Sequence, residues 1–289
     1  MKGPLTIIGP GVLGRSLAGW AALQGFEVRL VGRDLPHATL GKDRVKMEWL
    51  KALKRGRLSQ EDLDTASTRL KAYPTWSSAM EGTEILLEAL PENLEIKAQA
   101  WKVLHATASD TTLRLTGSSS LPIASLAKAA GMDFPLLGFH LFVPVNRMHL
   151  VELVIPERSV NPLSMRAENF GRDLGLHVVR VRDVPGYAAS RMALAQGLEA
   201  MRLLEEGVAS AEDIDSLMVK GYGHPMGPLA LSDHIGLDLR LTIAEALFQA
   251  TGNPRYEPPE VLRSKVAQGL TGRKVGRGFY VWEEGGSRS

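Results

Sequence analysis

A glycine-rich stretch near the start of the chain has the spacing that a dinucleotide phosphate requires. It follows a short apolar run over residues 5–8, precedes a helical pattern over residues 12–23, and reads Gly9, Pro10, Gly11, Val12, Leu13, Gly14. In this strand–turn–helix context the GxGxxG pattern predicts a phosphate loop, and a glycine-rich turn without a ligand is the alternative. Gly9 would permit the tight turn, Gly11 the approach of a pyrophosphate, and Gly14 the packing of helix against strand. We therefore expect this loop to bind a dinucleotide through the residues Gly9, Gly11, Val12, Leu13 and Gly14, with the helix N-terminus facing the phosphates.

The end of the second predicted strand, residues 26–31, bears on which dinucleotide is bound. NAD-binding units usually place Asp or Glu there, where the carboxylate holds the ribose 2′-hydroxyl. Here the strand is followed by Gly32 and Arg33, a small residue and a cation that would accept a 2′-phosphate. The sequence thus predicts an NAD(P) cofactor and favours NADP over NAD, although Asp34 is close enough to keep NAD open.

Three polar residues at later strand candidates have the chemistry of a proton transfer. Ser119 lies in a run of serines after the strand predicted over residues 112–115, His140 follows the strand over 136–139, and Glu152 lies within the strand over 150–154. Doubly wound sheets bind ligands at the carboxyl ends of their strands. A histidine can take the proton of an alcohol, and a neighbouring carboxylate fixes its tautomer. This pattern favours His140 as a general base.

Each of these residues also has a structural alternative. A histidine at a strand end is often only a hydrogen-bonded structural residue, and one of the serines can cap a helix predicted to begin at Leu121. His149 and Glu152 resemble metal ligands, but strand alternation puts them on opposite faces, so no metal site is predicted.

The order of predicted elements indicates the fold class. Strand and helix patterns alternate over residues 1–182, which predicts an α/β fold with a Rossmann-type, doubly wound sheet. Within it, residues 45–70 are typical of a helical pair that turns at Gly56. From residue 183 to 289 the patterns are mostly helical, which predicts a smaller all-α domain.

Composition narrows the class of protein. The chain has 289 residues, 44% apolar and 23% charged, a net charge of +2 and no cysteine. This excludes disulfides, thiolate catalysis and cysteine-based zinc sites. The basic residues form no long block, which argues against a nucleic acid partner. No apolar run is long enough to cross a bilayer and the N-terminus lacks a signal-peptide pattern, so we expect no membrane association and a cytoplasmic location.

Several further motifs extend over nearly the whole chain in a fixed order. They are residues 91–97 (PENLEIK), the Ser-Ser-Leu turn at 119–121, residues 140–145 (HLFVPV), 150–152 (LVE), 225–228 (PMGP), 233–238 (DHIGLD) and 276–280 (GRGFY). Together with the phosphate loop, they make the chain resemble the 3-hydroxyacyl-CoA dehydrogenases. The resemblance implies reversible oxidation of an (S)-3-hydroxyacyl-CoA to the 3-oxoacyl-CoA, and a homodimer formed through the C-terminal domain.

The resemblance also implies roles for individual residues. His140 would be the general base, Glu152 would orient it, and Ser119 would hydrogen-bond the reacting oxygen of the substrate. The side chains implied near the cofactor are Glu92, Lys97 and Lys274. The implied substrate contacts are Ser119, Ser190 and Arg55, and Arg55 matches a position associated with the coenzyme A phosphates.

The chain departs from the family where Asn is usual, because it has Gly117, Val143 and Ser190 instead. Each lost neutral hydrogen bond would weaken orientation of substrate or cofactor by about 0.5–1.5 kcal/mol. Two other functions therefore stay open: a related 3-hydroxyacid dehydrogenase that does not use coenzyme A, and a non-catalytic NADP-binding protein.

Overall fold

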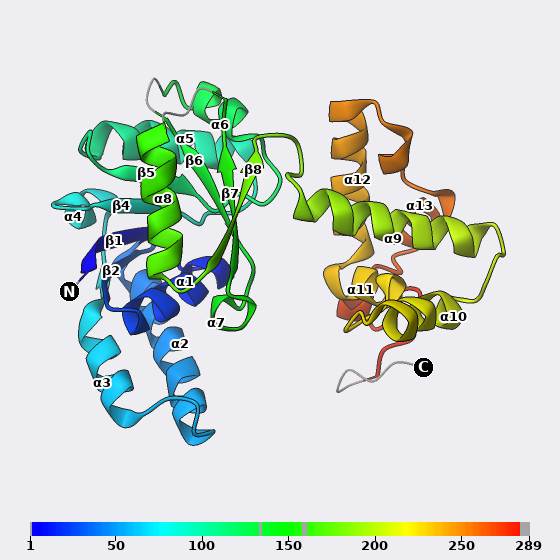
Figure 1. Cartoon of the computed structure of the whole chain (residues 1–289), viewed down its shortest axis with the longest axis horizontal. Helices are drawn as coiled ribbons and strands as arrows, with labels where there is room; N and C mark the ends of the chain where they lie inside the picture. Colours follow the sequence, from blue (N-terminus) through cyan, green and yellow to red (C-terminus); the bar gives the residue numbers. More distant parts are fainter. Residues whose placement is uncertain (1, 133–134, 158–160, 284–289) are drawn as a thin grey trace. The chain divides into compact units, whose positions relative to one another are not determined.

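The computed structural model of the chain describes residues 2–132, 135–157 and 161–283. The chain forms two compact units, Met1–Tyr187 and Ala188–Ser289 (Figure 1). The boundary predicted between residues 182 and 183 lies at the end of the last strand of the sheet, five residues before this division.

The first unit is built on one eight-stranded sheet with the order β3-β2-β1-β4-β5-β6-β7-β8. Neighbouring strands pair in parallel except for β6 and β7, which are antiparallel. This confirms the predicted Rossmann-type α/β fold. The strands are β1 (Lys2–Ile8), β2 (Phe26–Val31), β3 (Leu70–Tyr73), β4 (Ile85–Glu88), β5 (Leu113–Thr116), β6 (Leu137–Leu141), β7 (Leu150–Ile155) and β8 (His177–Arg182).

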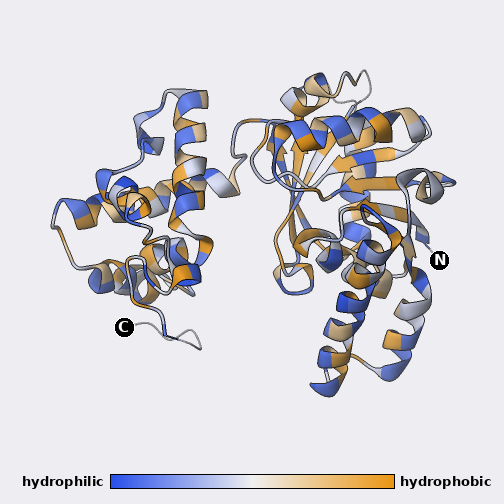
Figure 2. Ribbon diagram, turned by 180° about the vertical axis from the view of Figure 1, so that it is seen from behind, coloured by the Kyte–Doolittle hydropathy of each residue, from blue (hydrophilic) through white to orange (hydrophobic). Residues whose placement is uncertain are grey.

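Helices cover both faces of this sheet. The helices are α1 (Val12–Leu23), α2 (Leu35–Lys54), α3 (Gln60–Arg69), α4 (Trp76–Met80), α5 (Leu94–Thr107), α6 (Ile123–Ala129), α7 (Val145–Met148) and α8 (Asn161–Asp173). One core includes Leu17, Trp49 and Phe170 from α1, α2 and α8, and the other includes Trp101 and Leu126 from α5 and α6. Figure 2 shows the strands between them as predominantly hydrophobic. Because both faces are buried, the ends of the strands are left to carry the chemistry.

Helices α2 and α3 extend beyond the sheet as an antiparallel pair (Figure 1). Their turn contains Gly56 at φ +63°, a left-handed conformation in which glycine costs little. Asp34 begins α2 as its N-cap, and Ser59 begins α3 in the same way. The predicted helical pair is therefore present, although its first helix starts ten residues before residue 45.

The second unit is helical. Its elements are α9 (Ala189–Glu205), α10 (Ala211–Ser216), the π-helical turn η1 (Leu217–Gly221), α11 (Pro228–Ile235), α12 (Leu237–Thr251), η2 (Pro254–Tyr256), α13 (Glu260–Ala267) and η3 (Arg273–Val275). Its core contains Leu198, Leu229, Leu237 and Trp282. Among the described residues, no helix is both long and apolar enough to span a membrane.

Two buried carboxylates explain the C-terminal sequence motifs. Asp215 accepts hydrogen bonds from the backbone N–H groups of Leu229 and Ala230, at 2.8 and 3.0 Å. Asp233 accepts from the backbone N–H groups of Phe279 and Tyr280, at 2.9 and 3.0 Å. These motifs therefore anchor helix α11 and the C-terminal segment within the second unit.

Candidate active site

The phosphate loop joins β1 to α1, and each glycine in it has a distinct physical reason. Gly9 has φ +107°, and a Cβ there would lie 2.6 Å from the carbonyl oxygen of Ala89. A Cβ on Gly14 would lie 1.9 Å from the carbonyl oxygen of Gly9. A Cβ on Gly11 would meet nothing closer than 4.0 Å, so the protein itself does not require glycine at this position. Gly11 is the N-cap of α1 and supplies no side-chain hydrogen bond, so a bound anion is free to cap the helix.

The end of β2 has no room for an acidic side chain at residue 32. A Cβ on Gly32 would lie 2.7 Å from the backbone nitrogen of Ala38, at the start of α2. The carboxylate of Asp34 accepts the backbone N–H of His37 at 2.7 Å, which engages it in capping α2. The side chain of Arg33 is 81% exposed, and its Nε lies 3.4 Å from Asp34 Oδ2. Of the two charged side chains that follow β2, the cation Arg33 is therefore more exposed than the carboxylate of Asp34.

A buried ion pair underlies the carboxyl ends of β4 and β5. Lys97 Nζ lies 2.8 Å from Glu88 Oε1, and the two side chains are 1% and 0% exposed. Thr116 Oγ1 donates to the other carboxylate oxygen of Glu88 at 2.7 Å. Lys97 also donates to the carbonyl oxygen of Leu90 at 3.1 Å. Since water cannot solvate these charges, their geometry fixes the loop that follows β4.

That loop carries Glu92, whose carboxylate is held by the serine turn, residues 118–121. Glu92 Oε1 accepts the backbone N–H groups of Ser119 and Ser120 at 2.9 and 2.8 Å, and the hydroxyl of Ser118 at 2.7 Å. Its Oε2 lies 3.5 Å from Lys97 Nζ. Burial by itself raises the pKa of Glu92, but Lys97 and the hydrogen bonds of the serine turn outweigh it and hold the pKa below its ordinary value. Glu92, Lys97 and Ser119 are thus brought together.

The first turn of α6 is capped by a residue other than the serines. The carboxylate of Asp183 accepts the backbone N–H groups of Ile123 and Ala124, at 2.8 and 2.7 Å. The expectation that a serine caps a helix starting at Leu121 was therefore wrong, because the helix starts at Ile123. Ser118 Oγ accepts the N–H of Leu121 within the turn, at 3.1 Å.

His140 and Glu152 face each other across the antiparallel pair of β6 and β7. They are directly opposite in register, and His140 Nδ1 lies 2.7 Å from Glu152 Oε2. Both side chains are largely buried, at 12% and 4% exposure. The rings of Phe142 and Tyr187 lie 4.8 and 5.9 Å from the imidazole. A carboxylate on Nδ1 fixes the tautomer and leaves Nε2 to exchange a proton.

The metal-ligand alternative for His149 has no support in the geometry. His149 has φ +47° at the end of α7, and its ring packs edge-on against Trp20 at 5.2 Å. Among residues 2–132, 135–157 and 161–283, no three His, Asp or Glu side chains are close enough to hold a metal ion.

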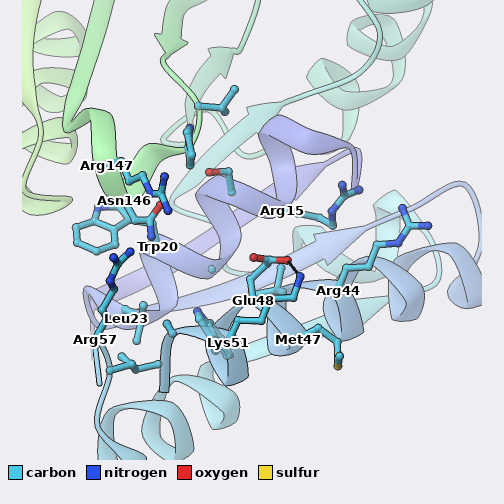
Figure 3. A pocket seen from close by; sticks show the side chains of 18 of the residues that line it. Arg15, Trp20, Leu23, Arg44, Met47, Glu48, Lys51, Arg57, Asn146 and Arg147 are labelled. Carbon is cyan, nitrogen blue, oxygen red and sulfur yellow. Dashed lines mark hydrogen bonds and ion pairs between the residues drawn. The ribbon is translucent and has the colours of Figure 1, made fainter. Parts of the chain in front are cut away.

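A groove of about 980 Å³ lies on the first unit between α1, α2 and the segment around α7 (Figure 3). Its lining includes six cations, which are Arg15, Arg44, Lys51, Arg55, Arg57 and Arg147. Burial and the neighbouring guanidinium of Arg44 lower the pKa of Arg15 below its ordinary value. The carboxylate of Glu48 is paired with Lys51 at 2.7 Å. This excess of positive charge is typical of a site for a phosphorylated ligand.

The remaining predicted residues lie in different places. Arg55 is the C-cap of α2 and lines the groove. Ser190 lies in the first turn of α9, and Lys274 lies in η3 with its Nζ 2.5 Å from Asp238 Oδ2, so both belong to the second unit. Val143, 44% exposed, also lines the groove.

Sequence reasoning missed three residues that shape this site: Glu88, Thr116 and Tyr187. Glu88 ends the apolar strand β4, in which every residue but Ile85 is buried, and Thr116 ends β5, in which every residue is buried. A carboxylate at the end of such a strand was the available signal for Glu88. Tyr187 gives no comparable signal, since its role depends on how the chain turns after β8.

The Rossmann-type fold and its phosphate loop are those of a dinucleotide-binding protein. The family model for the 3-hydroxyacyl-CoA dehydrogenase NAD binding domain matches residues 4–184, and the model for the C-terminal domain of the same family matches residues 186–282. The chain belongs to the 3-hydroxyacyl-CoA dehydrogenase family, which confirms the resemblance in the sequence.

Individual relatives agree over almost the whole chain. A probable 3-hydroxybutyryl-CoA dehydrogenase of Bacillus subtilis is 34% identical over 280 residues, 97% of each protein. The mitochondrial hydroxyacyl-coenzyme A dehydrogenase of Sus scrofa is 32% identical and covers 96% of this chain and 91% of its own. The crystal structure of (S)-3-hydroxybutyryl-CoA dehydrogenase from Ralstonia eutropha superimposes with a TM-score of 0.93 at 31% identity, covering 97% of this chain and 99% of its own.

Proposed function

We propose that this protein interconverts an (S)-3-hydroxyacyl-CoA and the 3-oxoacyl-CoA, with short acyl chains such as hydroxybutyryl as substrates. The observation that carries the proposal is the pair of His140 Nδ1 and Glu152 Oε2, 2.7 Å apart at the carboxyl end of β6. The names of the Bacillus subtilis and Ralstonia eutropha relatives support the substrate class.

The role proposed for His140 and Glu152 is a proton transfer. When bound, the nicotinamide accepts the hydride from C3 of the substrate. His140 Nε2 takes the proton of the 3-hydroxyl, and the negative charge of Glu152 stabilises the imidazolium that results. In the reverse direction the imidazolium returns this proton to the forming alkoxide. Ser119, whose hydroxyl donates to Glu92 at 3.3 Å in this structure, keeps the role implied by the family resemblance, a hydrogen bond to the same substrate oxygen.

The cofactor is proposed to be NADP in preference to NAD. Gly32 admits no acidic side chain, Asp34 is engaged as a helix cap, and Arg33 is exposed beside them. A 2′-phosphate there would meet the Arg33 guanidinium and the N-terminal end of α2, both of which favour an anion. Glu92 is proposed to contact the cofactor directly. Lys97 would act through Glu92, because its own ammonium is enclosed.

Coenzyme A is proposed to place its phosphates in the cationic groove. Arg55 and Arg57 follow α2, Arg44 lies on it, and Arg147 reaches the groove from α7 (Figure 3). This cluster supports an acyl-CoA substrate over a free hydroxy acid, which carries no phosphate. Ser190 and Lys274 keep their proposed substrate and cofactor roles, carried over from the family.

The chain is also proposed to form a homodimer through the helical unit. Large apolar side chains are exposed there, including Met192 at 73%, Leu217 at 64% and Tyr222 at 77%. Contiguous exposed apolar surface is typical of an interface between subunits, and the family resemblance assigns the dimer interface to this unit. Analytical ultracentrifugation of the purified protein measures its oligomeric state directly.

The cytoplasmic location of the protein stays a prediction from the sequence.

The deciding experiment follows oxidation of NADPH and of NADH with acetoacetyl-CoA, for the wild type, His140→Gln, Glu152→Gln and Arg33→Ala. We expect His140→Gln to abolish turnover. Glu152→Gln should lower kcat roughly 10- to 150-fold, because it removes a charge-assisted hydrogen bond. Arg33→Ala should raise KM for NADPH by a similar factor and leave KM for NADH nearly unchanged.

Four results would overturn parts of the proposal. Undiminished turnover in His140→Gln would exclude this residue as the base. Faster turnover with NADH than with NADPH would reject the cofactor preference. Turnover of free 3-hydroxy acids, with Arg55→Ala leaving KM for acetoacetyl-CoA unchanged, would favour a dehydrogenase that does not use coenzyme A. Tight NADPH binding without turnover of any 3-hydroxyacyl compound would favour a non-catalytic role.

A further inference from the structure

Tyr187 is held in a conformation that a large side chain rarely adopts. Its φ is +48°, directly after Gly186 at φ +71°. Its side chain is nevertheless buried, with the residue 1% exposed. A left-handed backbone at a bulky residue costs free energy, so the surrounding contacts must stabilise it, and such outliers concentrate at functional sites.

Those contacts are with the serine turn. The hydroxyl of Tyr187 donates to the carbonyl oxygen of Leu121 at 2.7 Å. The backbone N–H of Gly186 donates to the carbonyl oxygen of Ser120 at 3.3 Å, and Asp183 caps the helix that follows. Burial raises the pKa of Tyr187 above its ordinary value, so the hydroxyl stays protonated as a donor. The segment 183–187 is thus bound to the turn that carries Ser119.

The same tyrosine ring lies against the proposed general base. Its centroid is 5.9 Å from that of the His140 imidazole, at an interplanar angle of 51°. On the other side, His140 is held by Glu152 at 2.7 Å. Tyr187 therefore contacts both the imidazole and the serine turn, the two groups that must approach one substrate oxygen.

We propose that Tyr187 is a positioning residue of the reaction, whose hydroxyl holds the serine turn and whose ring holds the His140 imidazole, so that the distance between base and serine is fixed. This inference rests on the proposed function. It assigns no proton transfer to Tyr187 itself. Loss of the hydroxyl should slow the chemical step more than it weakens binding, because misplacement of catalytic groups acts on the transition state.

The test compares Tyr187→Phe with Tyr280→Phe. Both remove one buried hydroxyl, but that of Tyr280 lies 2.9 Å from the carbonyl oxygen of Ala211 and 2.9 Å from the carboxylate of Asp215, both in the second unit. We expect Tyr187→Phe to lower kcat with acetoacetyl-CoA and NADPH about 2- to 12-fold, the range for one neutral hydrogen bond, with both KM values nearly unchanged. Tyr280→Phe should lower Tm, because it removes a buried hydroxyl, and it should leave kcat unchanged. Tyr187→Leu, which also removes the ring beside His140, should lower kcat further.

His140→Gln, measured in parallel, separates the two possible failures. If His140→Gln is inactive and Tyr187→Phe has the kcat of Tyr280→Phe, the positioning inference is wrong and the proposed function stands. If His140→Gln keeps wild-type turnover, the base assignment fails and the inference fails with it. A fall in kcat for Tyr187→Phe that is matched by an equal rise in KM would also overturn positioning, since it would indicate a binding role.

Discussion

Replacing Lys97 by Met should destabilise the first unit strongly, because the substitution removes the cation that pairs with Glu88 and Glu92. The pair of Lys97 and Glu88 is 2.8 Å long and buried on both sides. With the ammonium gone, the Glu88 carboxylate keeps the hydrogen bonds from Thr116 and Leu90 but loses its counter-charge at a site that is closed to solvent. The folded state therefore loses the free energy that it costs to bury the Glu88 carboxylate without a counter-charge.

The expected loss in the free energy of unfolding follows from the burial of Lys97 and Glu88. Removing one partner of a buried pair costs about 3–5 kcal/mol. For a unit of this size each kcal/mol lowers Tm by about 2–4 °C, so Tm should fall by roughly 6–20 °C. The pair of Lys51 and Glu48 provides a matched control, because it has nearly the same length, 2.7 Å, but its side chains are 55% and 71% exposed. Lys51→Met should cost at most about 1 kcal/mol.

Scanning calorimetry of the two variants and of the double variant Glu88→Gln/Lys97→Met measures this difference. The double variant should recover most of the loss, because the neutral amide that replaces the Glu88 carboxylate needs no counter-charge. The same fall in Tm for Lys97→Met and Lys51→Met would refute the reasoning, since burial would then make no difference between pairs of equal length.

Two further predictions concern Glu92 and the phosphate loop. Because the pKa of Glu92 is lowered, its contribution to stability is complete above the ordinary value of 4.5 and is lost as pH falls through the folded-state pKa. The Tm of the wild type should therefore fall more steeply in acid than that of Glu92→Gln, and parallel curves would contradict this. Gly14→Ala should lower Tm, since its Cβ would lie 1.9 Å from a backbone oxygen, whereas Gly11→Ala should melt like the wild type. Calorimetric titration should show that Gly11→Ala has lost NADPH affinity, and unchanged affinity would reject the phosphate loop.

The parts of the site that were predicted from sequence are those fixed by regular structure. The phosphate loop follows from a strand, three glycines and a helix, each with a local signature. His140 and Glu152 both lie in strands, so their encounter required only that β6 and β7 pair in one register. In such a pair, directly opposite side chains lie on the same face of the sheet.

The parts that were missed depend on contacts between loops. Glu92 itself was predicted, but its contact with the serine turn, which begins 26 residues further along the chain, uses backbone and hydroxyl donors that no periodicity specifies. Tyr187 reaches Leu121 across 66 residues, and only because the backbone adopts a left-handed conformation after β8. The cap of α6 was assigned to the wrong residue for the same reason, because Asp183 approaches from a distant strand. Local sequence contains none of this information.

Two departures from the family pattern, Gly117 and Val143, lie in the first unit, where the pair of His140 and Glu152 is intact. A Cβ on Gly117 would lie 2.5 Å from Cδ2 of Leu13, so the phosphate loop itself fills the space beside residue 117. Val143 lines the groove together with Val12, and the two are 44% and 66% exposed. An apolar surface thus replaces a hydrogen-bonding amide next to the phosphate loop, whereas the hydrogen bond between His140 and Glu152 keeps its geometry. These substitutions should therefore alter the affinity and placement of the cofactor and substrate, and leave the proton transfer unchanged.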